Sequence, residues 1–241
     1  MLRLMTYNVH RCVGVDRRLD VDRIASVIDA ARPDIVCLQE LDVDRARTGR
    51  VDQAQAIADR LSMSVRFNAA FRIEAEQYGD AILTHLPERL VKAGPLPNHP
   101  TLPGLEPRGA LWSEMSVNGR RLNVINTHLG LVPREQRLQA EALCGPEWLG
   151  ACEGPTILTG DFNCTSITRP YRILVRRLHD AQRLLALKPT LKTFPAGRPI
   201  IRIDHAFVTP DVRVVGASVP GDDVVRVASD HRPLVVDFSL D

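Results

Sequence analysis

The segment PTILTGDFNCTS, residues 155–166, places polar side chains directly after a run of residues that favours a buried strand. Four apolar or β-favouring residues, TILT, lead into Gly160, and Asp161 and Asn163 follow with only Phe162 between them. Gly, Asp and Asn are also common in ordinary turns, because Gly tolerates positive φ and Asx side chains bond to nearby backbone. A functional interpretation therefore requires the same pattern elsewhere in the chain.

The spacing within this segment predicts how its side chains point. In an extended backbone residues i and i+2 face the same side, so Asp161 and Asn163 are expected to point together into a site. Phe162 is then expected to turn into the core and anchor the segment. Gly160, which has no Cβ, is expected to let the backbone pass close to the site.

The pattern recurs at the ends of other predicted strands. A buried polar group without a partner is costly, so each of these side chains needs a partner, and one shared location would supply it. Each residue alone fits an ordinary turn or a satisfied strand end, but their joint occurrence favours a single site. They are Asn8 in TYNVH, Glu40 in VCLQELD, His128 in VINTHLG, Asp204 in IRIDHAFV, and Asp230 with His231 in ASDHRPLVVDF.

The chemistry of this set indicates a metal-assisted reaction on phosphate. Carboxylates and carboxamides are hard oxygen donors, which suit Mg²⁺ or Mn²⁺. Such a cation polarises a phosphoryl oxygen and stabilises the leaving oxygen, while histidines paired with carboxylates carry protons or donate to developing charge. The sequence has no HExxH zinc motif and no GxxxxGK[ST] nucleotide-binding loop.

Composition predicts one soluble globular domain over residues 1–241. The chain is 44% hydrophobic and 25% charged, an ordinary balance for a single core. A net charge of +2 is too small for a dedicated nucleic-acid binder, and 5% aromatic residues disfavour a stacking platform for single strands. Five cysteines without a CxxC pair indicate neither zinc nor disulfides. A strand at residues 2–9 leaves no room for a signal peptide. No apolar run is long enough to span a membrane. A cytoplasmic monomer is therefore expected.

Hydrophobic periodicity predicts an α+β fold with two packed, mixed but mainly antiparallel sheets and helices outside. Residues 93–107, with five prolines and two glycines, are expected to form a loop. Asn118-Gly119 predicts a hairpin turn. The expected helices are 20–31 (capped by Asp20), 51–61, 133–143 and 169–179, and the expected strands are 2–9, 34–41, 65–70, 80–84, 88–92, 109–117, 121–129, the segment before Gly160, 203–208, 212–218 and 233–239.

Seven segments in order, TYNVH, DIVCLQELD, YGDAILTHLP, NTHLG, TGDFNCTS, RIDHAFV and SDHRPLV, resemble the endonuclease/exonuclease/phosphatase superfamily over nearly the whole chain. That group includes deoxyribonucleases, abasic-site endonucleases, inositol polyphosphate phosphatases and neutral sphingomyelinases. EPRGAL (106–111) and the later TFP and RIDH segments most resemble small bacterial metal-dependent hydrolases of the group. The resemblance implies a four-layer α/β/β/α sandwich whose loops converge on one edge.

The resemblance also implies roles for individual residues. Glu40 is expected to be the principal metal ligand, with Asn8 and Asp230 contributing to the metal site. Asp161 is expected to align or activate the attacking water, and Asn163 to hold the phosphate or Asp161. His231 is expected to contact the scissile phosphate, and Asp204 to orient His231. The other implied site residues are His128 as a second donor, Tyr78 as an active-site tyrosine and Arg108 as a substrate-binding residue.

Two positions depart from the family pattern. Asp80 stands where relatives often carry Asn, and it is expected either to help hold the metal or to orient His128. His205 stands where several relatives carry Tyr, and strand alternation predicts that it turns away from the site and is structural.

The substrate stays open between several phosphate esters. A phosphodiesterase acting on nucleic acid is one interpretation, and an enzyme acting on phospholipids or inositol phosphates is the alternative. An inactive binding scaffold is disfavoured because every core group is present. Arginine groups follow Asn8, Glu40 and Asn163 and would favour an anionic substrate if their loops surround the mouth. A lipid substrate would require an exposed apolar rim, for which residues 94–105 are the apolar loop available.

Overall fold

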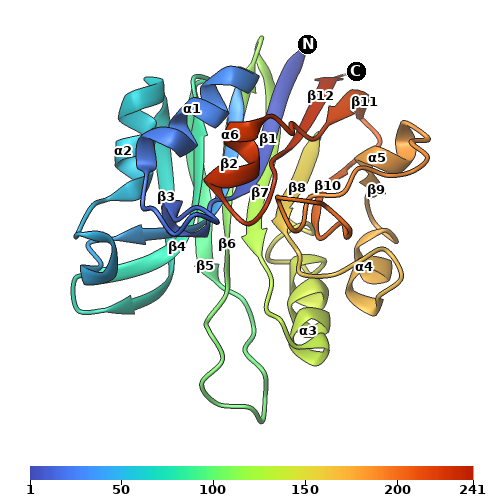
Figure 1. Cartoon of the computed structure of the whole chain (residues 1–241). Coiled ribbons are helices and arrows are strands. Elements are labelled where there is room, and N and C mark those ends of the chain that lie inside the picture. The colour runs from blue at the N-terminus through green and yellow to red at the C-terminus, as the bar shows by residue number, and fades with distance from the viewer. Residues whose placement is uncertain (241) are drawn as a thin grey trace.

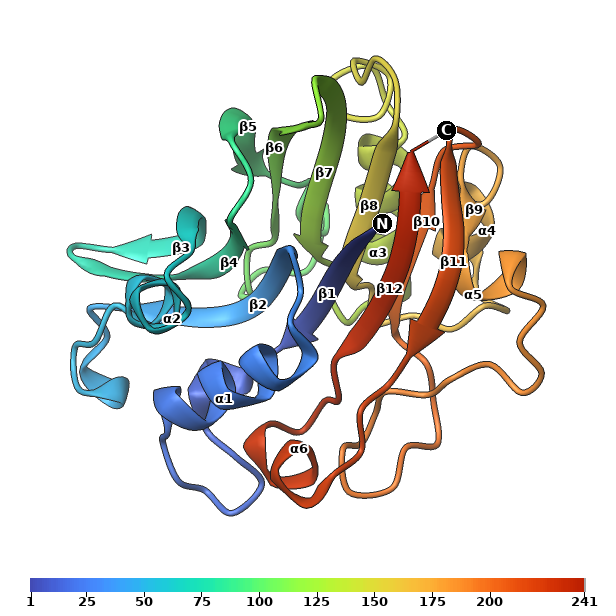
Figure 2. The same ribbon diagram turned by 90° about the horizontal axis from the view of Figure 1, so that it is seen from above.

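The computed structural model describes residues 1–240, which form two six-stranded sheets packed face to face (Figures 1 and 2). The first sheet contains Leu2–Asn8 (β1), Ile35–Val43 (β2), Ser64–Ile73 (β3), Glu76–Thr84 (β4), Val212–Ser218 (β11) and Leu234–Leu240 (β12), in the order β11-β12-β1-β2-β4-β3. The second contains Glu88–Pro95 (β5), Gly109–Val117 (β6), Arg120–His128 (β7), Thr156–Asp161 (β8), His179–Asp180 (β9) and Asp204–Val208 (β10), in the order β5-β6-β7-β8-β10-β9.

Helices cover the outer face of each sheet. The first sheet carries Val21–Ala31 (α1), Gln53–Leu61 (α2) and Asp223–Ala228 (α6), and the second carries Pro133–Leu143 (α3) and Arg169–Leu174 (α4). The short helix Ala181–Leu184 (α5) contacts β10 of the second sheet and β11 of the first, and short 3₁₀ turns lie at His10–Cys12 and Ala46–Thr48. β1 runs parallel to β2 and β7 parallel to β8, whereas the other pairs are antiparallel. The predicted four-layer sandwich with mixed, mainly antiparallel sheets is confirmed.

Four apolar clusters hold the layers together, the smallest of them formed by Ala181, Ala206, Leu234 and Val236. One lies between the first sheet and α1, α2 and α6, another between the second sheet and α3 and α4. The third joins the two sheets and includes Leu4, Ile82, Leu111, Val124 and Phe238, all of them buried. Because this central core takes side chains from both sheets, neither sheet buries its inner face alone.

Local sequence signals account for several element boundaries. The carboxylate of Asp20 accepts a hydrogen bond from the Arg23 backbone N–H (2.8 Å), which caps α1, and the helix ends before Pro33. Asn118 and Gly119 both have positive φ and connect β6 to β7, as the sequence predicts. Gly160 has φ +144°, and a Cβ there would lie 1.8 Å from the Thr127 carbonyl oxygen. Only glycine therefore lets β8 approach β7 this closely.

Several predicted bounds were wrong, and the short elements β9, α5 and α6 were missed. The proline-rich loop begins later than residue 93, because β5 continues to Pro95; β5 is an edge strand, where a missing N–H is tolerated. The helix expected at 169–179 ends at Leu174, after which the backbone tightens into turns that lead into β9. The short helix α6 was not predicted, although Asp222 caps it by accepting from the Val225 N–H (3.0 Å).

One edge of the sandwich gathers the strand ends that matter for function. It is the lower edge in Figure 1, where β1, β7 and β8 end, where β10 begins, and beyond which the loop between β5 and β6 projects. The two termini lie at the opposite edge. Within residues 1–240, no helix combines the length and the apolar character needed to cross a membrane.

Candidate active site

The polar residues singled out in the sequence meet at this edge. Parallel pairing of β7 with β8 sets His128 opposite Asp161, and antiparallel pairing of β10 sets Asp204 opposite the same Asp161. In the first sheet Asn8 ends β1, and Glu40 lies in the neighbouring strand β2. Asn8 Nδ2 donates both to Glu40 Oε1 (2.9 Å) and to Asp161 Oδ2 (3.0 Å). This amide links the two sheets into a single site.

Asp204, His231 and Asp161 form a buried cluster. His231 Nδ1 lies 3.0 Å from Asp204 Oδ2, and its Nε2 lies 3.6 Å from Asp161 Oδ2. One ligand-type atom from each residue lies within 4.8 Å of the other two. The cluster thus forms a polar chain from Asp204 through the imidazole to Asp161.

The charges of this cluster are set by burial and by one another. Burial alone would lower the pKa of His231, but the carboxylates of Asp204 and Asp161 outweigh it and raise the pKa to about 10. Burial raises the pKa of Asp161, although the charge of His231 opposes the shift. His231 is therefore an imidazolium at neutral pH, with its Nε2–H directed at Asp161.

His128 is held in a different state by Arg108. The Arg108 Nη1 lies 2.8 Å from His128 Nδ1, and a guanidinium can only donate, so Nδ1 accepts. The remaining ring proton then lies on Nε2. Burial lowers the pKa of His128 well below its ordinary value, and the positive charges of Arg108 and His231 act in the same direction. His128 is therefore a neutral imidazole with a fixed tautomer.

The Nε2–H of His128 faces a second donor. Asn163 Nδ2 donates to the Leu129 carbonyl (2.9 Å), which sets the orientation of the amide, and the same Nδ2 lies 3.1 Å from His128 Nε2. Asp161 Oδ2 lies 3.5 Å from that ring nitrogen. Two N–H donors side by side favour an anionic oxygen placed within reach of both.

The backbone at Asn163 differs from the extended conformation that the sequence predicted. Asn163 has φ +49°, and its backbone N–H donates to Asp161 Oδ1 (2.9 Å), so residues 161–163 form an Asx turn. The two side chains nonetheless meet at His128. Phe162 is fully buried and packs edge-on against Phe207, which confirms its anchoring role.

His205 lies outside the site, as strand alternation predicts. It is buried among aromatic rings and lies 5.7 Å from Phe162 between ring centroids. Its Nε2 contacts the Cys164 carbonyl at 2.8 Å. Burial lowers the pKa of His205 to about 4, so the ring is neutral and structural.

Glu40 projects from an irregularity in β2. The pairing of β2 with β4 shifts register between Leu38 and Leu41, and Glu40 has φ +62°. A β-bulge of this kind redirects a side chain out of the strand pattern. A buried carboxyl, that of Asp80 on β4, accepts a hydrogen bond from the Glu40 backbone and supports the bulge.

The structure places Asp80 against the expected metal ligand Glu40 rather than against His128. Its contact is to the backbone of Glu40, and Arg108 rather than Asp80 orients the ring of His128. Burial raises the pKa of Asp80 to about 8, although the charge of Arg108 and the Glu40 N–H lower it. Asp80 is therefore largely protonated at neutral pH.

A polar cavity of about 260 Å³ opens beside Glu40. Tyr78, predicted as catalytic, lines this cavity, and so does Asp230, a predicted metal ligand. His10, Arg11, Arg47 and Glu106 complete its lining. Arg11 and Arg47 belong to the arginine groups that the sequence places after Asn8 and Glu40, whereas His10 and Glu106 were missed although they lie within the recognised segments TYNVH and EPRGAL.

The donors around this cavity fit a hard divalent cation. Glu40, Glu106 and Asp230 supply carboxylate oxygens on its wall, and Asn8 adds an amide that already bonds Glu40. No thiol and a single imidazole, that of His10, line it, which suits Mg²⁺ or Mn²⁺ better than zinc.

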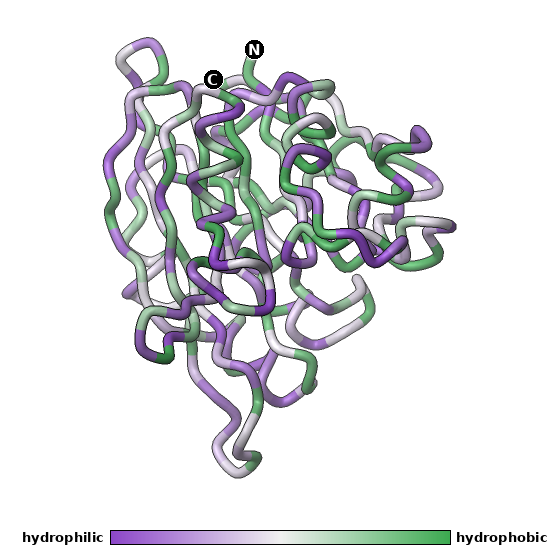
Figure 3. Tube along the Cα trace, turned by 60° about the vertical axis from the view of Figure 1, so that its left-hand side comes forward, coloured by the Kyte–Doolittle hydropathy of each residue, from purple (hydrophilic) through white to green (hydrophobic). Residues whose placement is uncertain are grey.

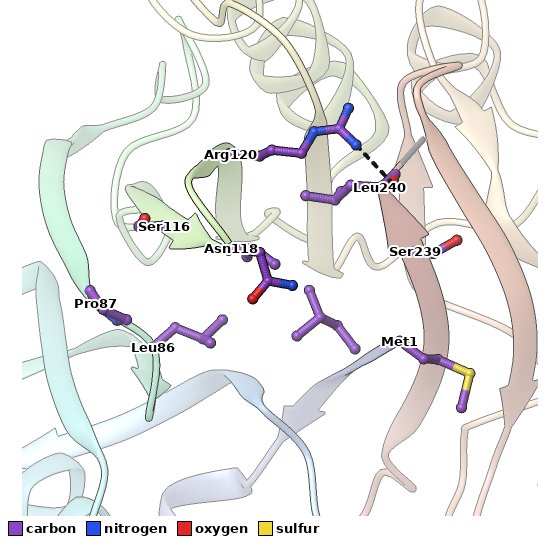
Figure 4. Close-up of a pocket in the computed structure, with 10 residues that line it drawn as sticks. Met1, Leu86, Pro87, Ser116, Asn118, Arg120, Ser239 and Leu240 are labelled. Carbon is purple, nitrogen blue, oxygen red and sulfur yellow. Dashed lines mark hydrogen bonds between the residues drawn. The ribbon is translucent and has the colours of Figure 1, made fainter.

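A larger cavity, of about 550 Å³, lies at the opposite edge beside the termini (Figure 4). Met1, Leu86, Asn118 and Leu240 line it, and Arg120 Nη1 donates to the Leu240 carbonyl (3.0 Å). None of the predicted site residues is among its lining residues.

Comparisons with known proteins identify the family to which this fold belongs. The Endonuclease/Exonuclease/phosphatase family profile matches residues 5–231, and the chain belongs to that family. YbhP of Escherichia coli K12 is 24% identical, in an alignment covering 99% of this chain and 96% of YbhP. A crystal structure of a family protein from Beutenbergia cavernae has a TM-score of 0.78 and 26% identity, covering 99% of this chain and 71% of that one. The Bacteroides thetaiotaomicron mannosyl-6-phosphatase Bt3783 has a TM-score of 0.78 and 21% identity, with full coverage of both chains.

Proposed function

We propose that this protein is a phosphodiester hydrolase that depends on Mg²⁺ or Mn²⁺ and uses an activated water for in-line attack. The observation that carries the proposal is the pair of facing donors, His128 Nε2–H and Asn163 Nδ2–H, 3.1 Å apart beside Asp161. A phosphoryl oxygen beside this pair, within reach of both N–H groups, would accept from both. The imidazolium of His231, on the other side of Asp161, would donate to a second oxygen of the same group.

Asp161 is the residue proposed to act on the water. Its Oδ1 accepts from the Asn163 N–H and its Oδ2 from Asn8, which hold the carboxylate in one orientation. Burial raises its pKa, so it is a stronger base than an exposed carboxylate and can accept a proton from the attacking water. Asp204 keeps His231 charged and oriented while this occurs.

The cation would be held by Glu40, Asn8 and Asp230 at the polar cavity. Bound there, it would polarise a phosphoryl oxygen and stabilise the leaving oxygen. The substrate proposed is a phosphodiester, in nucleic acid or, as the alternative, in a phospholipid or an inositol phosphate. Structural neighbours differ in this respect: one is a mannosyl-6-phosphatase and another is human nocturnin, described with bound sulfate, so the fold alone does not select the ester.

The test is hydrolysis of bis(p-nitrophenyl) phosphate and p-nitrophenyl phosphate with Mg²⁺, with Mn²⁺ and with chelator. We expect metal-dependent cleavage of the diester in preference to the monoester. Asp161→Asn and His231→Ala should each lower kcat by about 10²–10⁴-fold with an unchanged circular dichroism spectrum. Asp223→Asn, on the exposed side of α6, is the matched control and should leave kcat unchanged.

Two results would contradict the proposal. Full activity in chelator would exclude a required cation. A change confined to KM in the Asp161 and His231 variants would mean that these residues bind substrate without taking part in the chemical step.

A further inference from the structure

The segment between Asn163 and Asp204 has an unusual charge. Residues 165–202 contain nine lysines and arginines and one acidic residue, Asp180, whereas the whole chain has a net charge of only +2. The rest of the chain is therefore acidic on balance. The two ends of the segment adjoin the site residues Asn163 and Asp204, so the charged residues near those ends lie close to the candidate active site.

The positive charge of this segment is on the surface. Asp180 is buried and paired with Arg202, so neither contributes to the exterior. The other eight cations are exposed. Among residues 1–240, no acidic group forms an ion pair with any of these eight. Arg169, Arg172 and Arg176 follow a spacing of three and four residues along α4 and its last turn, so they lie on one face.

Exposed aliphatic side chains border the same edge. Leu131 is 71% exposed, Ile167 81% and Ile200 59%. Leu131 lies in the loop that follows His128, and Ile167 in the loop that follows Asn163. We call these three residues the apolar rim.

Ile200 belongs to a loop that packs against His231. In this loop the Phe194 ring lies 4.9 Å from the His231 ring, and the Ala196 N–H donates to the Asp230 carbonyl (2.7 Å). Leu131, Ile167 and Ile200 therefore place exposed aliphatic side chains from three separate loops near the candidate active site. The projecting loop between β5 and β6 adds a fourth, Leu102, among its mixed apolar and polar residues (Figure 3).

We propose that the apolar rim and the basic face of residues 165–202 dock this protein onto an anionic membrane surface, with the candidate active site facing the lipid. Basic side chains are attracted by acidic headgroups, and aliphatic side chains between them enter the boundary with the acyl chains. A nucleic acid fits less well, because Ile and Leu side chains offer nothing to a phosphate backbone. The two aromatic rings of the segment, Tyr171 and Phe194, are buried and half-buried and cannot stack on bases.

The test is binding of the full chain to sedimented vesicles, which needs no turnover and is therefore separate from the hydrolysis assay. We expect binding to vesicles of phosphatidylcholine with phosphatidylglycerol, and weak binding to phosphatidylcholine alone. Arg176→Glu/Arg177→Glu should lower binding by about 25-fold or more, since each basic residue near an anionic surface contributes roughly fivefold. Ile167→Ser/Ile200→Ser should lower the part of the binding that survives high salt by about tenfold.

Arg32→Glu/Arg60→Glu is the matched control. It reverses the same number of charges at the C-cap of α1 and in the last turn of α2, in the helical layer of the first sheet, and should change binding by less than about twofold, because charges beyond the contact are screened. Absence of binding to the acidic vesicles at low salt would overturn the proposal. So would equal losses in the control and in the Arg176/Arg177 variant, or tight Arg176/Arg177-dependent binding of duplex DNA without vesicle binding.

Discussion

The protonation state of His128 follows from one contact. Arg108 donates to Nδ1, and burial together with nearby positive charge keeps the ring neutral, so only Nε2 carries a proton. His231 differs, because Asp204 holds the proton on its ring. The two histidines of the site are therefore not interchangeable: one is a cationic donor and the other a neutral one.

We predict that Arg108 determines the tautomer of His128. In the ¹⁵N NMR spectrum of histidine-labelled protein, His128 should remain neutral and Nε2-protonated from acid to alkaline pH. Arg108→Leu should produce a mixture of tautomers and lower kcat by about 10–100-fold, while Arg108→Lys should retain part of both. A doubly protonated His128 ring at neutral pH in the unaltered protein would contradict the assignment.

Asp80 provides a prediction about stability and pH. Its folded-state pKa, about 8, is raised above the value in the unfolded chain, so the protein loses stability as pH rises through the window from about 4 to 8. Asp80→Asn removes this loss. In the metal-free protein it should raise the free energy of unfolding by roughly 5 kcal/mol at pH 8 and change it little at pH 4, since each unit of pKa shift corresponds to about 1.4 kcal/mol.

Urea unfolding of both proteins at several pH values is the measurement. The difference between them should grow with pH and level off above about 8. A constant difference across the range would show that Asp80 titrates normally in the folded protein.

At the scale of elements, α3 fixes the two loops that follow β7 and β8, which carry the donors His128 and Asn163. Gln136 is buried, and its Nε2 donates to the Gly130 carbonyl (2.9 Å) and to the Asn163 carbonyl (2.8 Å). One turn along the helix, Gln139 accepts from the Gly130 N–H (2.8 Å). The loops that follow β7 and β8 are thus fixed relative to one another through a helix that contributes no catalytic group.

We predict that Gln136→Ala impairs activity through position. Two buried carbonyls would lose their donor, which should cost about 2–3 kcal/mol of stability and about tenfold in kcat. Arg137→Ala, the neighbouring change on the exposed side of α3, removes a pair with Glu141 and should cost about 0.5 kcal/mol or less. Equal effects of the two changes on kcat would show that the Gln136 bridge has no positioning role.

The elements that sequence predicts well have local causes. Asp20 caps a helix within three residues, and Asn118-Gly119 forms a turn within two, so their signals are complete in a short window. The turn at Asn163 was misjudged because its conformation depends on an Asx hydrogen bond that competes with the extended strand. Alternation along a strand describes direction only while the strand continues, and β8 ends at Asp161.

The site residues were recognised as a set, but their partners were not. The contact of Arg108 with His128 joins residues that precede β6 and end β7, and only the register of the hairpin brings them together. That register could have been counted outward from the Asn118-Gly119 turn: Ala110 pairs with Thr127, which sets Arg108 close to His128. The sequence contains no comparable signal for the bulge at Glu40, because the bulge depends on how β4 pairs with β2.

At the scale of the whole molecule, residues 1–241 are predicted to unfold as one unit. The central core joins both sheets, and Asn8 links them again at the site. Calorimetry should therefore show a single transition whose calorimetric and van't Hoff enthalpies agree. Two resolved transitions would mean that the sheets are separate domains.

The place of β12 in the first sheet has a consequence for synthesis. This last strand lies between β11 and β1. One edge of β1 therefore has unpaired backbone N–H and C=O groups until residues 234–240 have been synthesised. While the chain emerges from the ribosome, β1 can pair with β2 but keeps an open edge, and an open edge invites pairing with other chains. Chains cut short before β12 should therefore aggregate and become chaperone clients, even though Asn8, Glu40, Asp161 and His231 have all been made.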